Sequence, residues 1–196
     1  MNVITLNDIG FEEECARLST KVPDVGDLAL LIGVRNGGVR VAQIVFENLV
    51  CENKNLKYYE VGASRYATES KNSNSVKLLF NCLPYFLLDL FRVFERYIVS
   101  FRMLFVSAPD RSLYLDDELL DFLTNLGETK LLIIDDAIDS GATLKVLLDK
   151  LHSINPKLEC KVAVLVVTQN NPLVFPDVCL YQNVLLRFPW SSDYKS

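Results

Sequence analysis

Three aspartates follow a run of apolar residues in the segment LLIIDDAIDSGATL, which runs from Leu131 to Leu144. Asp135 and Asp136 are adjacent at the expected end of a buried strand, and Asp139 opens a turn of small residues before a helical pattern. Backbone N–H groups at a helix start can bind an anion, and small residues let a phosphate approach them closely. Because three acids would repel a bare phosphate, the pattern favours a ligand that also carries hydroxyl groups or a metal ion. A phosphorylated sugar with Mg²⁺ meets both conditions.

The alternative interpretation of this segment is an ordinary strand-to-helix turn with Asp139 or Ser140 as the helix N-cap. A lone acidic pair would favour that alternative. The complete ordered string favours a ligand site, because hydroxyl, glycine and small residues follow the acids where a phosphate would need them.

Strands that alternate with helices must position this segment, and they predict an α/β domain with a mainly parallel sheet. Ligands of such sheets bind beyond the carboxyl ends of the strands. We expect strands at residues 28–34, 56–63, 130–135 and 161–168, with a last one within 177–188, and helices at residues 11–19, 37–50, 115–127 and 142–154.

The acidic segment closely resembles the loop with which type I phosphoribosyltransferases bind phosphoribosyl diphosphate (PRPP). That resemblance implies the fold of this family, a mainly parallel sheet flanked by helices, in a single domain over residues 1–196. It also implies that Asp135 and Asp136 face the ribose hydroxyls and contact Mg²⁺ indirectly through the Mg–PRPP complex. Asp139 would be the catalytic base that receives the acceptor's proton. The full PRPP-binding set would be Asp135, Asp136, Ala137, Asp139, Ser140, Gly141, Ala142 and Thr143, with the 5-phosphate on Asp139 to Thr143.

Two further segments resemble loops of the same family. LIGVRNGGVRVA (31–42) is similar to the pyrophosphate loop, which implies that Arg35, Asn36, Gly37 and Gly38 contact pyrophosphate. Related enzymes often carry a basic residue directly before the glycine pair, whereas Asn36 stands there in this chain. VGASRYATES (61–70) is similar to the hood loop that closes over the substrate and keeps water away, with Ser64, Arg65 and Tyr66 at its core. Taken alone, the first segment is typical of any turn and the second of a surface hairpin.

The carboxyl-terminal segment bears on the acceptor. RFPWSSDY (187–194) resembles the end of oxopurine phosphoribosyltransferases, where a Pro-Trp segment lies beside the base. Trp190 would therefore stand on the acceptor side, although it could equally cover the core. In those relatives a lysine after the fourth strand reads the purine oxygen. Here Thr168, Gln169, Asn170 and Asn171 follow the strand and no lysine stands there.

Residues 72–114 have no counterpart in that resemblance, and we expect a helical insertion at the hood. Within it, residues 76–106 are rich in Leu, Phe and Tyr, and Asp89, Arg92 and Arg96 form one polar stripe. Its uninterrupted apolar run is too short to span a bilayer. An apolar and mildly basic segment could lie on a membrane surface, or it could be buried in the core or in a homodimer interface.

The bulk composition limits the class of protein. Half of the 196 residues are hydrophobic, so we expect a folded chain with a sizeable core. The net charge of −5 argues against nucleic acid as a partner, although local basic patches could still exist. The five cysteines have no metal-ligand spacing and the sequence has no signal peptide pattern, which together predict a cytoplasmic protein with reduced thiols. A peripheral location at the inner membrane face is the alternative.

The missing lysine and the insertion together favour an unusual acceptor. We expect an enzyme that transfers 5-phosphoribosyl from PRPP, with release of pyrophosphate, to a sugar hydroxyl of a lipid-linked glycan during polysaccharide biosynthesis. The first alternative is a nucleobase (purine-type) salvage phosphoribosyltransferase. The second is a PRPP-sensing regulator without catalysis. A homodimer is expected in each case.

Overall fold

A central sheet of six strands forms the body of the protein in the computed structural model, which describes residues 2–34, 36–65, 84, 87, 89, 111–191 and 193–195. The strand order is β4-β3-β2-β5-β6-β7, and all neighbouring pairs are parallel except β3–β4. The bounds are β2 Leu28–Val34, β3 Lys57–Arg65, β4 Arg111–Tyr114, β5 Thr129–Ile138, β6 Leu158–Val167 and β7 Val178–Gln182. The mainly parallel sheet predicted from the sequence is confirmed.

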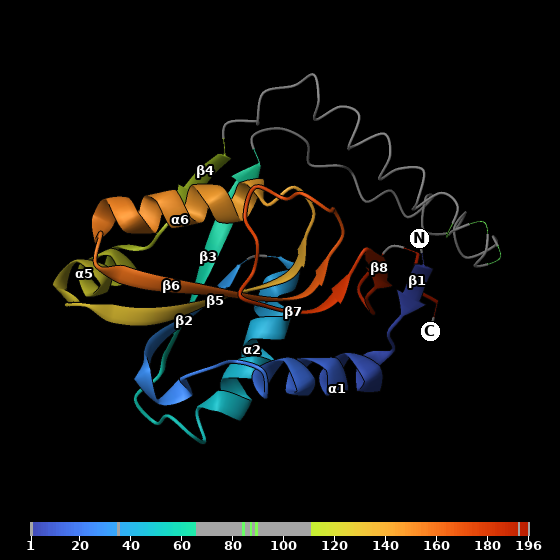
Figure 1. Cartoon of the computed structure of the whole chain (residues 1–196), viewed down its shortest axis with the longest axis horizontal. Coiled ribbons are helices and arrows are strands. Elements are labelled where there is room, and N and C mark those ends of the chain that lie inside the picture. The colour runs from blue at the N-terminus through green and yellow to red at the C-terminus, as the bar shows by residue number, and fades with distance from the viewer. Residues whose placement is uncertain are drawn as a thin grey trace.

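Helices cover both faces of this sheet (Figure 1). Helices α1 (Asp8–Ser19) and α2 (Gly37–Leu49) lie on one face, and α5 (Asp117–Asn125) and α6 (Ala142–Ile154) lie on the other. A hydrophobic core lies on each face of the sheet, and strand β5 contributes to both because its successive side chains point to opposite faces. Leu132 and Ile134 pack with α1 and α2, whereas Leu131 and Ile133 pack with α5 and α6.

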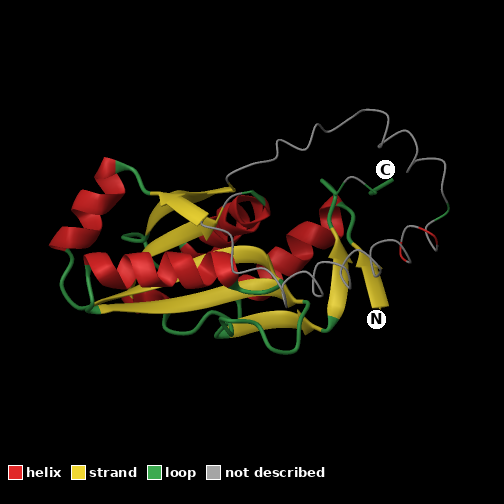
Figure 2. Cartoon of the chain, turned by 90° about the horizontal axis from the view of Figure 1, so that it is seen from above, coloured by secondary structure: helices red, strands yellow, loops and turns green. Residues whose placement is uncertain are grey.

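A second, two-stranded sheet lies at one end of the molecule, near both chain termini (Figures 1 and 2). It pairs β1 (Asn2–Thr5) in parallel with β8 (Val184–Arg187). The sequence predicted one strand within residues 177–188, but Asn183 adopts a left-handed conformation with φ 56° and divides the region into β7 and β8. Because β8 starts directly after β7 ends, this small sheet lies beside the carboxyl edge of the main sheet.

The small sheet is fastened by one buried arginine. Arg187 is 2% exposed, and its guanidinium donates to Thr5 Oγ1 at 2.9 Å, to Asp193 Oδ2 at 2.9 Å and to Asp89 Oδ1 at 2.6 Å. Asp89 belongs to the sequence insertion, and most of that insertion lies outside the described residues. Arg187 therefore ties a point of the insertion to the small sheet and to the carboxyl-terminal segment.

We expect Asp89→Ala to lower the free energy of unfolding by about 1 kcal/mol, because a charge-assisted hydrogen bond to a buried arginine is lost while two partners remain. Urea denaturation measures this change. The matched control is Asp149→Ala, which breaks an exposed pair with Lys145 on α6 and should cost no more than about 0.5 kcal/mol. Equal stability of the two variants would show that the Asp89 contact does not hold the insertion.

The expected helical insertion can be compared with the structure at few positions. Of residues 72–114, the structure describes Pro84, Leu87, Asp89 and the strand β4 at the end of the range. Those last four residues are a strand, not part of a helix, because they pair antiparallel with β3. Among the described helices, none is long and apolar enough to cross a membrane.

Candidate functional site

The two adjacent aspartates lie in β5 itself, not at its end as the sequence suggested. Strand β5 continues to Ile138 because it stays paired with β6, from Asp135 opposite Val164 to Ile138 opposite Val167. Its pairing with β2 stops at Ile134. Beyond that point, in the described part of the chain, the start of α2 takes the place of β2 beside β5. The sheet therefore opens at the two carboxylates.

The glycine pair after β2 is explained by this close approach. A Cβ at Gly38 would lie 2.6 Å from Asp135 Oδ1 and 2.8 Å from Asp135 Cα, and a Cβ at Gly37 would meet the Asp136 carboxylate. Such contacts are too short for any side chain, so glycine lets α2 begin directly against the acidic pair. The structure thus brings together the two segments that the sequence assigned to PRPP and pyrophosphate. Asn36 precedes α2 and is exposed, whereas Arg35 lies outside the described residues.

The acidic pair carries an electrostatic cost. Both aspartates are half-buried, and the Asp136 N–H donates to Asp135 Oδ1 at 2.9 Å. Burial, and then the neighbouring charge of Asp136, raise the pKa of Asp135 well above its ordinary value. Burial also raises the pKa of Asp136. Folding therefore places two acids where their charged forms are disfavoured, which is typical of residues kept for binding or catalysis.

We expect Asp135→Asn to stabilise the unliganded protein near neutral pH, by on the order of 1 kcal/mol. A carboxyl group whose pKa is raised by folding favours the folded state most below its unfolded pKa of about 3.9, and that contribution is lost as the pH rises through the folded pKa. The free energy of unfolding should therefore fall less with rising pH in Asp135→Asn than in the wild type. Denaturant titrations between about pH 4 and pH 8 measure it.

Asp121→Asn is the control for this prediction, because Asp121 is an exposed carboxyl on α5 and away from the acidic pair. Its profile should follow that of the wild type. If Asp135→Asn also followed the wild type, the acidic pair would carry no electrostatic cost.

The turn after β5 is shaped by Gly141. This residue is the N-cap of α6 with φ 74°, and a Cβ there would lie 2.8 Å from the backbone nitrogen of Val174. Neither Asp139 nor Ser140 is the N-cap, so the capping residue named in that alternative is wrong. The Ser140 hydroxyl instead accepts from the Ala142 N–H at 3.3 Å. The first N–H groups of α6 have no carbonyl partner within the helix, so this turn can hold an anion at the carboxyl end of β5.

Asp139 is exposed at the start of this turn and has a partner that sequence reasoning missed. Its Oδ1 accepts from the Thr168 hydroxyl at 2.5 Å. From the sequence, Thr168 was identified only as the first of the residues that follow the strand where relatives carry a lysine. The register of β5 against β6 places the two residues side by side, because Ile138 pairs with Val167 and Asp139 and Thr168 follow directly. No signal for this pairing was available beforehand, since the strand predicted from the sequence ended at Asp135.

No group of three or more potential metal ligands is found among the described residues. The donors at the site are the carboxylates of Asp135 and Asp136, which are hard oxygen ligands of the kind that Mg²⁺ uses in proteins. Two such groups fit a Mg²⁺ ion that takes its remaining ligands from phosphate oxygens and water. The residues present are therefore compatible with a magnesium-bearing phosphorylated ligand.

The expected hood loop is partly a strand. Ser64 and Arg65 are the last residues of β3 and pair with Ser112 and Arg111 of β4. Tyr66 lies outside the described residues. Residues 61–63 lie within the strand expected at 56–63, and Ser64 and Arg65 extend it because β4 supplies an antiparallel partner that the sequence did not reveal. The closing role of this segment stays a prediction.

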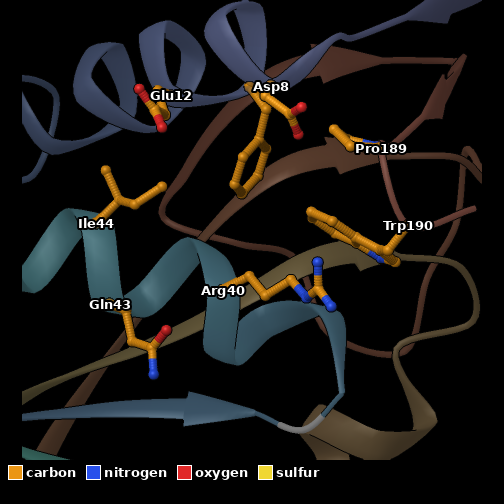
Figure 3. Close-up of a pocket in the computed structure, with 8 residues that line it drawn as sticks. Asp8, Glu12, Arg40, Gln43, Ile44, Pro189 and Trp190 are labelled. Atoms are coloured by element: carbon orange, nitrogen blue, oxygen red, sulfur yellow. The ribbon is translucent and has the colours of Figure 1, made fainter. Parts of the chain in front are cut away.

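Trp190 lies by a pocket between α1 and α2, with a volume of about 370 Å³ (Figure 3). Its ring stacks on Phe188 with centroids 4.7 Å apart and meets Phe11 edge-on at 4.9 Å. The Arg40 guanidinium lies 4.8 Å from the ring centroid. Trp190 thus covers the core and lines a pocket, whose lining residues are Asp8, Phe11, Glu12, Arg40, Gln43, Ile44, Pro189 and Trp190. None of the residues Asp135–Thr143 is among them.

Comparison with known proteins gives a family and a set of similar folds. The family model described as phosphoribosyl transferase domain matches residues 9–184. No curated protein matches the sequence. The purine phosphoribosyltransferase of Pyrococcus horikoshii superposes with a TM-score of 0.61 at 17% identity, over 97% of this chain and 95% of that one.

Two other solved structures are similar over comparable lengths. The xanthine-guanine-hypoxanthine phosphoribosyltransferase of Helicobacter pylori has a TM-score of 0.60 at 15% identity, over 96% of this chain and 94% of that one. A hypothetical protein from Neisseria gonorrhoeae with bound ppGpp has a TM-score of 0.58 at 16% identity, over 97% and 89% of the two chains. At these identities the superpositions establish a shared fold.

Proposed function

The chain belongs to the phosphoribosyl transferase family, and from that premise we propose that it transfers 5-phosphoribosyl from PRPP to a nucleobase of the purine type, with release of pyrophosphate. The observation that carries this proposal is the arrangement of three features along the carboxyl end of β5. The acidic pair Asp135–Asp136 meets the glycine pair Gly37–Gly38 where β2 and β5 part, and the turn Asp139–Gly141 follows at the end of β5.

Each feature suits one part of PRPP. The start of α6, from Ser140 to Thr143, offers N–H groups and hydroxyls to the 5-phosphate. Asp135 and Asp136 accept hydrogen bonds from the ribose hydroxyls. The start of α2, at Gly37 and Gly38, offers N–H groups to the pyrophosphate, and their donated hydrogen bonds stabilise the negative charge that grows on it as it leaves. Arg35 is proposed as a further pyrophosphate contact on the family resemblance alone.

Asp139 is proposed as the base. The acceptor nitrogen attacks the anomeric carbon as the bond to pyrophosphate breaks, and the acceptor's proton passes to the Asp139 carboxylate. Asp139 is exposed at the carboxyl edge, where an acceptor can reach it. When bound with PRPP, Mg²⁺ would supply charge neutralisation of the diphosphate, and Asp135 and Asp136 would contact it indirectly, through the Mg–PRPP complex. Ser64, Arg65 and Tyr66 are proposed to keep water from the reacting sugar.

The class of acceptor, nucleobase or glycan, is proposed on separate grounds. The glycan acceptor that the sequence favoured has no support in the described residues, because the insertion 76–106 lies almost wholly outside them. Two of the similar structures are named as purine or oxopurine phosphoribosyltransferases, which favours the nucleobase alternative. The absence of lysine after β6 still separates this chain from the pattern expected of oxopurine enzymes. We propose that the side-chain amides of Gln169, Asn170 and Asn171, together with backbone groups, recognise the nucleobase in place of a lysine. Trp190 is proposed to lie on the acceptor side.

The test is pyrophosphate release from PRPP and Mg²⁺ with hypoxanthine, guanine, xanthine and adenine offered separately. A nucleoside monophosphate should form with at least one base. Parallel reactions with lipid-linked glycans examine the alternative. Release with a glycan and with no base would overturn the nucleobase assignment but keep phosphoribosyl transfer, whereas PRPP binding without any turnover would favour the PRPP-sensing regulator.

A cytoplasmic homodimer is proposed for the whole protein. The four described cysteines, Cys15, Cys51, Cys160 and Cys179, all carry free thiols, which suits a reducing compartment. Membrane-surface contact through residues 76–106 is proposed from the sequence alone. If it exists, the protein should co-sediment more with anionic than with neutral vesicles, because Arg92, Arg96 and Arg102 favour anionic lipid. No sedimentation with either would exclude the contact.

A further inference from the structure

The segment that follows β6 is fastened to the turn that carries Asp139 at three points. The Thr168 N–H donates to the Ile138 carbonyl at 2.9 Å, and the Leu173 N–H donates to the Ser140 carbonyl at 2.8 Å. These two bonds fix the residues directly before and after Asp139. The third bond runs from the Thr168 hydroxyl to Asp139 Oδ1 at 2.5 Å, with the Ile138 carbonyl as a second, longer acceptor at 3.4 Å.

The third bond concerns the side chain that the proposed reaction uses. An exposed carboxylate ordinarily samples several rotamers, and Asp139 is exposed whereas Thr168 is only 3% exposed. The β-branched Thr168 is stiff at χ1 and is held by its own backbone bond, so its hydroxyl is a fixed donor. The Thr168 hydroxyl and Asp139 Oδ1 are 2.5 Å apart, so the two side chains are in direct contact.

We propose, resting on the proposed function, that Thr168 is a positioning residue that holds the Asp139 carboxylate in one rotamer, with Oδ1 engaged and Oδ2 turned to the acceptor. In the described part of the chain, Thr168 is the hydrogen-bond partner found for the Asp139 side chain. Thr168 lies directly after β6 and directly before the loop Gln169–Asn171, so it connects the proposed catalytic base Asp139 to that loop. A nucleobase bound at the loop would therefore meet a carboxylate that is already oriented.

Thr168→Val tests this role because it keeps the shape and the backbone bond but removes the hydroxyl. We expect kcat to fall about tenfold, the scale of one hydrogen bond, while the dissociation constant for PRPP changes less than twofold. Thr168→Ser retains the hydroxyl and should stay within about threefold of the wild type. In an Asp139→Asn background, Thr168→Val should cost less than twofold more, because the group on which it acts is already gone.

A second measurement needs no turnover. The χ1 coupling constants of Asp139, measured by NMR, should report one rotamer in the wild type and Thr168→Ser, and an average over several in Thr168→Val. An unchanged rotamer in Thr168→Val, or a full tenfold loss on top of Asp139→Asn, would overturn the positioning role. The wild type could turn over no acceptor and yet show one Asp139 rotamer that becomes averaged in Thr168→Val. In that case the proposed function would fail, while the role of Thr168 in holding Asp139 would stand.

Discussion

Gly141→Val should abolish PRPP binding, with a loss of affinity on the order of 100-fold or more. Two independent effects act at this position. The φ of 74° is unfavourable for a β-branched residue, and the new Cβ would lie 2.8 Å from the Val174 nitrogen. The turn must therefore change, and the N–H groups at the start of α6 no longer converge on the 5-phosphate. Losing two such charge-assisted hydrogen bonds accounts for the magnitude. Isothermal titration with PRPP and Mg²⁺ measures it.

Gly127→Val is the matched control for this variant. Gly127 follows α5 at an exposed position where a Cβ would meet nothing within 4 Å. It should bind PRPP as the wild type does. Because Gly141→Val also strains the fold, circular dichroism must first show that it is folded at the temperature of the titration. Unchanged affinity in folded Gly141→Val would remove the turn Asp139–Thr143 from the phosphate site.

Asp139→Asn should lower kcat for phosphoribosyl transfer by about 100-fold or more, the usual scale for a lost general base. The amide keeps the size of the carboxylate, so PRPP affinity should remain within a few-fold of the wild type. Steady-state rates of pyrophosphate release and a PRPP titration on the same preparation separate the two effects.

Asp149→Asn is the control for Asp139→Asn. Asp149 is also an exposed aspartate, but it lies in the body of α6 and not in the turn before that helix. Its rates should equal those of the wild type. Full activity in Asp139→Asn would mean that another group takes the acceptor's proton, and it would also remove the reason for Thr168 to hold this side chain.

The sequence predicted most of the main sheet because its strands are buried on both faces. Runs such as Leu28–Val34 are continuously apolar, and helices such as Ala142–Ile154 repeat their apolar residues at helical spacing. The observed bounds of β2 and α6 equal the predicted ones. Helix α1 was predicted three residues too short, because Asn7 caps it by accepting from the Gly10 N–H. A cap is decided by one side chain, which periodicity does not detect.

The small sheet and β4 were beyond such reasoning. Strands β1 and β8 join the two ends of the chain in four-residue segments, and a short segment carries little periodic signal. The Arg187 contacts with Thr5, Asp89 and Asp193 also join residues far apart in sequence. Nothing in the local sequence identifies such partners, since they depend on how the completed fold brings the segments together.

The candidate site was predictable in composition but not in detail. The acids, the glycine pair and the small-residue turn were all identified, because their order is specific. The reason for the glycine pair is the contact of α2 with Asp135 and Asp136, which follows from packing across the sheet. The Thr168 bond to Asp139 likewise needs the register of β5 against β6. Side-chain partners across strands therefore had to come from the structure.

A calorimetric titration of the intact wild-type protein with PRPP and Mg²⁺ decides whether the carboxyl edge of β5 is a PRPP site. Ribose 5-phosphate and pyrophosphate, titrated separately, report the two halves of the site. We expect saturable binding of PRPP at one site per chain, weaker binding of each half, and loss of binding in Gly141→Val but not in Gly127→Val. Absence of PRPP binding by the folded wild type, or equal binding by both glycine variants, would contradict this expectation.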